Sequence, residues 1–519
     1  MNKKIHITSL ILLLFSIALF TILGGFLDNE KYFNNYVVDF DTYNSIKSNL
    51  SRNEINNFDI KFDGYNLFFD KSDNRYYYSL IEGSKLAYNP KVELKSNYHI
   101  AINNMFITDD LISNNETIDF IIYNDRSYNE YHLTCTTLPL MNINYDGVEL
   151  FVDDQPMNLV LFDNQKETIN RVVTSLGNVR IRGRMTSNFD KQSMRIKLLE
   201  NDWWTERKEN LLGLRYDGDW ILYAGYNDVD KIRNVFSMNL WNNSCASNNA
   251  LKTNTGTEYK YLELFINGSY YGLYALSYPI DKKQLNLKDS DGLYQPYNHQ
   301  LEGDITYDNY DKVVSNMVLK NGYDHGLLFN YYESLFKSYK EENIESIKEL
   351  IDEDNAIDYF IFNNIVQGKD NASESIKNIK ICIKKIDGKY KCLYIPWDYD
   401  LSFGNVSNYD HKNYTDNYVY DSTYNVVHIN SPINMLIMLG DASTKDKLTK
   451  RYKELRTKQY SNDSINKIID EYENDIYGSG AYFREMKKWP DGSYTDDEYN
   501  LNKFRNYVIN RLEYLDTYF

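Results

Sequence analysis

The feature that most constrains the fold is a hairpin signal near the middle of the chain. Two alternating, apolar-rich runs, Ile379–Ile386 and Tyr390–Pro396, flank the pair Asp387-Gly388. An Asp-Gly pair between such runs predicts a two-residue type I′ turn, because both central residues of this turn need a positive φ. The turn fixes the register of the two strands, and with it the residues that meet at the open end of the hairpin.

The open end of this hairpin gathers acidic and amide side chains. A two-residue turn places Asn378 opposite Trp397, so the residues that come together there are Asp370, Asn378, Asp398 and Asp400. Carboxylate and amide oxygens suit a hard cation such as Mg²⁺, which takes oxygen ligands and keeps some of its water. The alternative is a polar hairpin end that faces solvent, since charged residues commonly cover surfaces.

Length and charge narrow the class of protein. With 519 residues the chain has room for two or three domains with their own cores, and its aromatic content of 15% argues against disorder. The formal net charge of −17 makes the chain a poor candidate for binding nucleic acid or anionic lipid. Its four cysteines show no metal-ligand spacing, and we expect them to be buried as small apolar residues.

The N-terminus carries a membrane signal. Residues 5–27 carry no Lys, Arg, Asp or Glu, follow Lys3 and Lys4, and end at Asp28. A run of this length can cross a bilayer as a helix and exceeds a typical secretory h-region. We therefore expect a single-pass signal anchor over residues 5–27, a cytoplasmic stub over residues 1–4, and an extracytoplasmic remainder by the positive-inside rule. Cleavage of this segment is the alternative.

The remainder divides into a β-rich part and an α-rich part. Short β-like runs separated by Asn, Asp and Ser clusters predict a small all-β, sandwich-like spacer domain over residues 28–138. Leu138-Pro139 marks a boundary, because proline restricts the residue before it. Residues 139–519 follow as an α+β domain, with a β-rich half over about 139–290 and an α-rich half over about 291–519.

Two local signals refine the β-rich half. Asn267-Gly268 predicts a second hairpin turn between alternating runs. An apolar stripe at helical spacing follows Asn227-Asp228, so one of these two residues is predicted to be the N-cap of a helix.

A basic strand–loop–strand lies upstream, from residue 179 to residue 199. Its cationic side chains are Arg180, Arg182, Arg184, Lys191, Arg195 and Lys197. Together with the polar loop between the strands, which follows Gly183, they are suited to cradling a polyanion. The alternative is an exposed strand pair whose charges block edge pairing.

Four segments in this order resemble the CotH family, the spore-coat protein H-like atypical protein kinases. They are VRIRGRMTSNFDKQSMRIKL, NLLGLRYDGDWILYAGYNDVDKIRN, YLELFINGSYYGLYAL and YIPWDYDLSFG. The resemblance covers about residues 140–519, and its most specific part is Pro-Trp-Asp-Tyr-Asp with the following Phe-Gly. It implies a two-lobed, kinase-like fold with ATP between a β-rich N-lobe and an α-rich C-lobe.

The resemblance also assigns roles to the acidic residues. Asp370 would be the catalytic-loop residue that orients the acceptor hydroxyl and takes its proton. Asn378 would bind metal, and either Asp398 or Asp400 would hold Mg²⁺ against the phosphates, with Asp398 favoured because it lies closer to the strand end.

On the basic side, the resemblance implies a phosphate-covering loop from Gly183 to Asp190. Either Lys197 or Lys191 would contact the α/β-phosphates, and Arg182, Arg184 and Arg233 would add positive charge. Two departures from the family pattern stand out. Ser277-Tyr278-Pro279 replaces the usual Thr-Glu pair, and the predicted helix over 228–241 contains no Glu to pair with a phosphate-binding lysine.

The expected function is that of an atypical Ser/Thr protein kinase using ATP and Mg²⁺, with Mn²⁺ as a substitute cation. Its protein substrates would be spore-coat or cell-surface proteins, and its location the membrane or the spore envelope. The alternatives are a coat or surface scaffold that has lost turnover, and a phosphotransferase that acts on a non-protein envelope acceptor.

Overall fold

The computed structural model describes residues 35–53, 58–82, 90–103, 111–147, 152–183, 186–296, 310–372, 378–407, 410–411, 413–415, 431–490 and 500–519. These residues form two compact units. The first unit runs to Ile112 and includes Glu116–Cys135, and the second comprises Ser113–Asn115 and Thr136–Phe519.

Within the described residues, each helix is too short or too polar to cross a bilayer. The predicted anchor, residues 5–27, lies outside the described residues.

The first unit is mainly β. Its strands are β1 (Val37–Val38), β2 (Ser51–Arg52), β3 (Lys61–Phe62), β4 (Tyr65–Asn66), β5 (Phe68–Asp70), β6 (Arg75–Ser79), β7 (Val92–Glu93), β8 (His99–Asn103), β9 (Ile118–Tyr123) and β10 (Ser127–Thr136). A sheet of order β1-β8-β9-β10-β6-β5, with β2 paired to β10, accompanies a smaller sheet of order β4-β3-β7. Both sheets contribute to one aromatic-rich core, in which the rings of Phe62 and Tyr78 lie 5.0 Å apart.

Helix α2 (Phe40–Asn49) corrects the prediction that this unit is all-β. Asp39 begins the helix, since its carboxylate accepts hydrogen bonds from the Thr42 backbone N–H at 2.7 Å and the Thr42 hydroxyl at 2.8 Å. Tyr43 is the helix residue that is fully buried, against Ala101 and Ile121 of the sheet. Because the helix buries so little apolar surface, the hydrophobic pattern did not reveal it.

The second unit begins with a closed seven-stranded barrel. Its strands are β11 (Leu140–Tyr145), β12 (Gln155–Phe162), β13 (Val172–Arg182), β14 (Ser193–Leu199), β15 (Asp219–Tyr223), β16 (Lys260–Ile266) and β17 (Ser269–Ser277), with a short turn of 3₁₀-helix, η2 (Thr186–Asn188), between β13 and β14. They close in the order β11-β12-β13-β14-β15-β17-β16. Val179, Ile196 and Leu262 are among the fully buried side chains that fill the interior. The first part of this unit is therefore built mainly of strands.

Helix α3 (Arg233–Ser244) begins later than the sequence predicted. Its N-cap is Ile232, without a side-chain cap, so neither Asn227 nor Asp228 is the N-cap. Asp228 nevertheless accepts a hydrogen bond from the Arg233 backbone N–H at 2.6 Å and pairs with the Arg233 guanidinium at 2.5 Å. The carboxylate therefore satisfies the helix N-terminus from the preceding loop.

The second half of this unit packs helices around a four-stranded sheet. Its elements are β18 (Gly292–Pro296), α4 (Tyr310–Ser315), β19 (Met317–Asn321), α5 (Gly326–Lys340), α6 (Ile344–Leu350), α7 (Glu353–Val366), α8 (Lys369–Ala372), β20 (Ile379–Ile386), β21 (Lys389–Pro396), β22 (Asn405–Ser407), β23 (Asp410–His411), α9 (Pro432–Met438), α10 (Ala442–Arg456), α11 (Asn462–Glu473), η3 (Asn474–Gly478), α12 (Ala481–Lys488) and α13 (Asn502–Leu515). The sheet has the order β19-β18-β20-β21.

The central hairpin has the predicted register. Ile379 pairs with Pro396 and Ile386 with Lys389, so β20 and β21 are joined by two residues. Asp387 and Gly388 have φ values of 49° and 84°, as a type I′ turn requires. The second predicted turn, at Asn267-Gly268, likewise has positive φ at both residues and joins β16 to β17. The four cysteines are free and buried, as expected.

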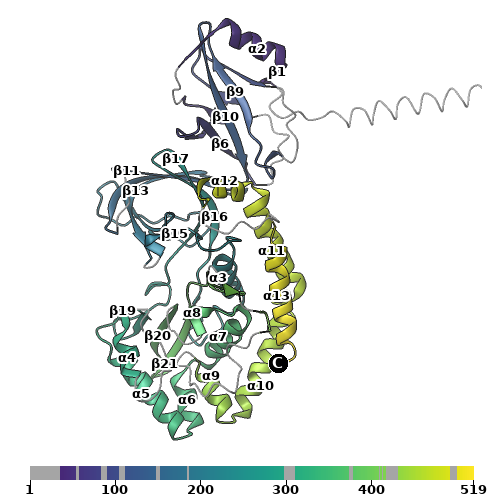
Figure 1. The fold of residues 1–519 in the computed structure, drawn as a ribbon. Helices are drawn as coiled ribbons and strands as arrows, with labels where there is room; N and C mark the ends of the chain where they lie inside the picture. The colour runs from purple at the N-terminus through teal and green to yellow at the C-terminus, as the bar shows by residue number, and fades with distance from the viewer. Residues whose placement is uncertain are drawn as a thin grey trace, which may run out of the picture. The chain divides into compact units, whose positions relative to one another are not determined.

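Helix α12 brings the C-terminal part of the chain back to the barrel, where it lies beside β16 and β17 (Figure 1). Arg484 of α12 is buried and pairs with the buried Glu263 of β16 through two contacts of 2.7 and 2.6 Å. Trp489 follows the helix and donates its indole N–H to the Tyr271 carbonyl at 2.7 Å. Residues from the far end of the sequence therefore pack against the closed barrel.

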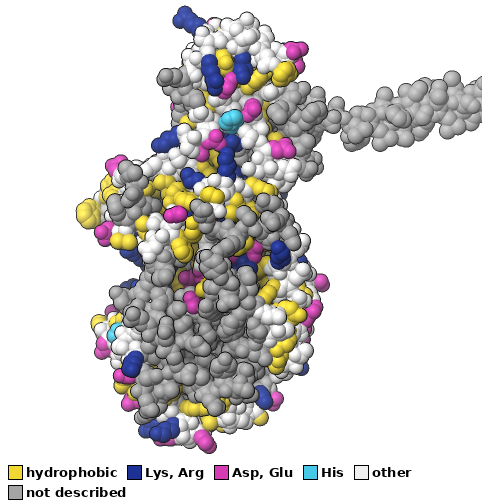
Figure 2. Space-filling model, viewed as in Figure 1, with side chains coloured by type: hydrophobic (Ala, Val, Ile, Leu, Met, Phe, Trp, Pro, Cys, Tyr) yellow, Lys and Arg dark blue, Asp and Glu magenta, His cyan; other side chains and the backbone are white. Residues whose placement is uncertain are grey.

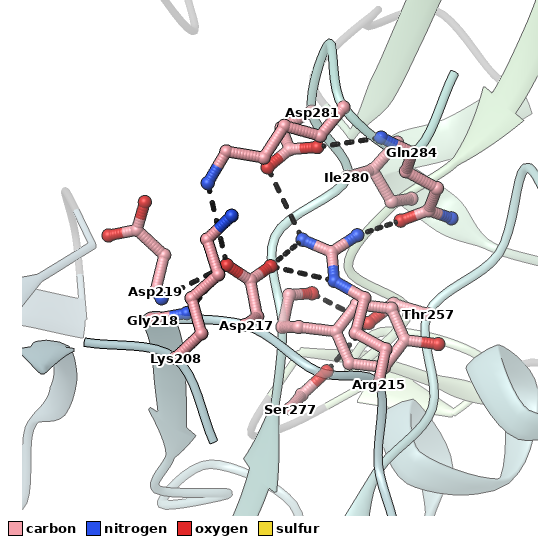
Figure 3. A network of polar contacts seen from close by, with 12 residues as sticks. Lys208, Arg215, Asp217, Gly218, Asp219, Thr257, Ser277, Ile280, Asp281 and Gln284 are labelled. Atoms are coloured by element: carbon pink, nitrogen blue, oxygen red, sulfur yellow. Dashed lines mark hydrogen bonds and ion pairs between the residues drawn. The ribbon is translucent and has the colours of Figure 1, made fainter. Parts of the chain in front are cut away.

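A polar network holds the linker that leads from β17 to β18 (Figure 3). The Arg215 guanidinium donates to the carboxylate of Asp217, to Gln284 at 2.5 Å and to Asp281 at 3.3 Å. Burial raises the pKa of Asp217, but Arg215 and two backbone N–H groups outweigh it and hold that pKa below its ordinary value. The linker is therefore anchored to the segment that precedes β15.

Candidate functional site

The predicted acidic residues meet at the open end of the β20–β21 hairpin. The side-chain amide of Asn378 donates to the Asp398 carbonyl at 3.0 Å, and the Asn378 backbone N–H donates to the Asp370 carbonyl at 3.1 Å. Asp398 has a φ of 59°, in the left-handed region that Asp tolerates better than most residues. The backbone therefore draws Asp370, Asn378 and Asp398 into one place.

Asn371 ties this open end together and was missed by the sequence reasoning. Its side chain is buried, and its amide nitrogen donates to the carbonyls of Asn378 at 2.6 Å and Trp397 at 2.9 Å. It thus bridges the two strand ends beyond the last ladder pair. In the sequence Asn371 directly follows Asp370. This position alone does not predict that its side chain bridges two strand ends.

Asp398 and Asp400 differ in how their oxygens are used. Asp400 accepts hydrogen bonds from the Asn227 amide at 2.7 Å on one oxygen and from the Leu401 backbone N–H at 2.9 Å on the other. Burial, with the charges of Asp398 and Asp370, raises the pKa of Asp400 to about 8. The Asp398 carboxylate accepts no hydrogen bond within the described part of the chain, and burial raises its pKa although Arg182 opposes the shift.

This acid cluster fits a hard cation that brings its own further ligands. Among the described residues, no group of three or more His, Cys, Asp or Glu could hold a metal by itself. Mg²⁺ commonly takes one or two carboxylates and completes its shell with water and substrate phosphate oxygens. Asp398, Asp400 and the side-chain oxygen of Asn378 could supply such a set, and a cation would stabilise the charged form of two carboxyl groups whose pKa values are raised mainly by burial.

Lys191 has a fully occupied ammonium group. The side chain is completely buried and donates to the carbonyls of Ala224 at 2.8 Å and Leu273 at 2.5 Å, and to Glu485 Oε1 at 2.6 Å. These acceptors use all three N–H donors of the ammonium. Burial lowers the pKa of Lys191 to about 8 although Glu485 opposes the shift. The arrangement favours a structural role for Lys191 over contact with a phosphate.

Glu485 of α12 is the acid that pairs with this lysine, and sequence reasoning missed it. Its second oxygen accepts the Leu273 backbone N–H at 2.9 Å, and a further buried lysine, Lys231, lies 3.9 Å from its first oxygen. The pair Lys191–Glu485 joins residues 294 positions apart. The acid that pairs with Lys191 therefore comes from the C-terminal part of the chain and not from helix α3.

The outer face of the β13–β14 ribbon is basic. Because Val179, Ile196 and Leu198 point into the barrel core, the alternate positions face outward. The outward cations are Arg180, Arg182, Arg195 and Lys197. Arg180 pairs with Asp154 at 3.2 Å and Arg195 with Asp219 at 3.1 Å, whereas Arg182 and Lys197 have no ion-pair partner in the described ranges.

Arg182 lies next to the acid cluster through Trp397. Its guanidinium carbon is 5.6 Å from the Trp397 ring centroid, and the Lys380 ammonium is 4.3 Å from the same centroid. Trp397 also packs against the small core cluster under β20 and β21. Gly183, directly after Arg182, has a φ of 106° and is exposed, and residues 184–185 of the predicted loop lie outside the described residues.

Lys380 is a second residue that sequence reasoning missed. It lies on β20, is 5% exposed, and donates to the Ile280 carbonyl at 2.8 Å. Burial, together with Arg182 and Lys320, lowers the pKa of Lys380 to about 7. The available signal was a lysine interrupting the apolar run Ile379–Ile383.

Comparison with known proteins identifies the family. No curated protein matches the chain. The family model described as CotH kinase protein matches residues 179–515, which include every predicted site residue as well as Glu485. The match spans more than half of the chain, from the basic strand of the barrel to the last helix. The chain therefore belongs to the CotH kinase family.

Proposed function

We propose that this protein is an ATP-dependent protein kinase that transfers the γ-phosphate of ATP to hydroxyl groups of spore-coat or cell-surface proteins. The observation that carries the proposal is the meeting of a buried acid cluster with a basic strand face. Asp398 lies close enough to Arg182 for the guanidinium to oppose the rise in the pKa of the carboxyl group. Phosphoryl transfer needs this pairing, because carboxylates hold the cation while basic groups neutralise the phosphates.

Each residue has a distinct task in this proposal. Asp370 would accept a hydrogen bond from the acceptor hydroxyl, orient it and take its proton. Asp398 and Asn378, supported by Asp400, would hold Mg²⁺ or Mn²⁺, and the bound cation would neutralise charge on the phosphates. Arg182, with the backbone at Gly183 and the outward Lys197, would bind phosphate oxygens.

The test is transfer of labelled γ-phosphate by the purified full chain. We expect incorporation into coat or surface protein extracts, or into the chain itself, with Mg²⁺ or Mn²⁺. Asp370→Asn should reduce incorporation by about 100-fold or more. Asp387→Asn, at the opposite end of the same hairpin, is the matched control and should retain full activity. Absence of transfer by the wild type would refute the proposal.

A second candidate is a scaffold that keeps the fold without turnover. It is favoured by one observation, namely that Lys191, one of the two lysines expected to contact phosphates, has no free donor. Thermal unfolding with added nucleotide discriminates in part, because a ligand at 100 times its dissociation constant adds about 2.7 kcal/mol to the free energy of unfolding. A higher melting temperature with ATP and Mg²⁺ supports the kinase. A melting temperature that no nucleotide changes supports the scaffold.

We also propose that residues 5–27 anchor the chain in the membrane. The large domain would then act on the extracytoplasmic side of the membrane or in the spore envelope. The support is the uncharged N-terminal run that follows Lys3 and Lys4. Protease added to intact cells should remove the extracytoplasmic part. Protection of the whole chain would contradict this location.

A further inference from the structure

Lys380 is a buried cation whose hydrogen bonding is incomplete. Its side chain is 95% shielded from solvent, and within the described residues one acceptor, the Ile280 carbonyl, receives a hydrogen bond from its ammonium. The ring of Trp397 covers another side at 4.3 Å. No carboxylate of the described residues forms an ion pair with it. A lysine buried in this way is costly unless something supplies negative charge.

A second cation lies against the same ring. The guanidinium carbon of Arg182, from β13, is 5.6 Å from the Trp397 ring centroid. Among the described residues Arg182 has no ion-pair partner. Two cations from two strands therefore lie against one ring, and no carboxylate of the described residues forms an ion pair with either.

A lysine on the same strand face shows what a satisfied structural role looks like. Lys384 also lies on β20, four residues further on, and donates to the carbonyls of Leu285 at 3.0 Å and Asn286 at 2.6 Å. It remains partly exposed, so water can complete its shell. Lys380 makes one such bond and is only 5% exposed. Holding the linker accounts for Lys384 but not for the burial of Lys380 beside Arg182 and Trp397.

We propose that Lys380 and Arg182, on either side of the Trp397 contact, form an anion subsite that binds the phosphate chain of the nucleotide. The subsite adjoins Asp398, so a phosphate held there lies beside the cation site of the hairpin. Lys380 thereby takes the task for which Lys191 has no free donor. This inference rests on the proposed use of ATP and names the lysine that recognises it.

The experiment measures binding of ATP, inorganic tripolyphosphate and adenosine to the full chain in the presence of Mg²⁺. Lys380→Met keeps the length of the side chain and removes its charge. We expect about 10-fold to 100-fold weaker binding of ATP and tripolyphosphate, since a charge-assisted hydrogen bond is lost, and unchanged binding of adenosine. Lys380→Arg should restore part of the affinity. Lys384→Met is the matched control and should bind all three ligands as the wild type does.

Thermal unfolding without ligand separates this role from a structural one. Removal of an unbalanced buried cation should leave Lys380→Met at least as stable as the wild type, which also shows that the variant folds. A lower melting temperature than wild type, or ATP binding equal to wild type, overturns the inference while leaving the kinase proposal standing. If the wild type binds neither ATP nor tripolyphosphate, both proposals fall. If Lys380→Met weakens binding but the wild type transfers no phosphate, the subsite stands and the kinase proposal falls.

Discussion

At the scale of single residues, the site depends on amides that position carboxylates. Asn378, Asn371 and Asn227 each donate to a group at the hairpin end or to Asp400. Burial, and after it the charge of neighbouring carboxylates, raises the pKa values of Asp398 and Asp400. The geometry is therefore set by neutral donors, and the charges are left for a cation.

Asn371→Ala tests whether an amide donor holds the two strand ends together. The change leaves the carbonyls of Asn378 and Trp397 without their donor in a buried place, so we expect a loss of about 1–3 kcal/mol in the free energy of unfolding. Urea denaturation of both proteins measures it. If the variant is as stable as the wild type, the two carbonyls find other partners and Asn371 does not hold the strand ends together.

The hairpin shows what a sequence can reveal at this scale. Asp387-Gly388 predicted the turn, and the turn fixed the register that brings Asn378 and Asp398 together. Local backbone chemistry determines such features, so a short stretch of sequence contains the information. The hydrogen bonds of the Lys191 ammonium could not be predicted in this way, because its acceptors come from the residue after β15, from the middle of β17 and from α12.

At the scale of elements, α12 is the part that sequence reasoning could not place. It lies within the predicted α-rich half, but no local pattern predicts that Arg484 and Glu485 reach the barrel to pair with Glu263 and Lys191. Two adjacent residues of opposite charge thus form two buried ion pairs. The helix fixes the barrel by charge pairing as well as by packing.

Glu485→Gln and Lys191→Met should lower the free energy of unfolding by different amounts. Glu485→Gln leaves the buried Lys191 without its acid and removes one of the negative charges near the buried Lys231, so we expect a loss of about 3–5 kcal/mol in the free energy of unfolding. Lys191→Met leaves Glu485 beside Lys231 and the Leu273 N–H, so we expect a smaller loss. A double-mutant cycle in urea measures the coupling. Equal costs for the two single variants would contradict the shared pairing.

The linker network of Figure 3 gives a pH-dependent prediction at the same scale. The folded-state pKa of Asp217 lies below its ordinary value of 3.8, so this carboxylate stabilises the fold above that pH and the contribution is lost as the pH falls through the folded-state value. Asp217→Asn should cost about 2 kcal/mol at pH 7, and the difference from wild type should shrink below about pH 4.

Denaturation curves at pH 7 and pH 3 measure this difference. The exposed turn variant Asp387→Asn serves as the control and should remain within about 0.5 kcal/mol of wild type at pH 7. A difference between Asp217→Asn and wild type that stays constant with pH would show that the carboxylate contributes by shape alone.

At the scale of the whole molecule, the order of elements matches what the sequence predicted for the kinase-like domain, a β-rich half followed by an α-rich half. The first unit was predicted less well, because the weakly apolar helix α2 left no clear pattern. Figure 2 shows acidic and basic side chains interspersed over the described surface of one face, without a continuous basic patch there. The basic groups that matter converge instead on β13, β14 and β20, next to the carboxylates.

The central claim is that the carboxylates at the hairpin end carry out phosphoryl transfer from ATP. The most direct measurement is intact-mass spectrometry of the full chain and an added protein acceptor after incubation with ATP and Mg²⁺. We expect phosphate to appear on the acceptor or the chain with wild type and Asp387→Asn, and to be absent with Asp398→Asn, whose fold is checked by its melting temperature. Phosphate transfer by a folded Asp398→Asn variant equal to that of wild type would contradict the claim.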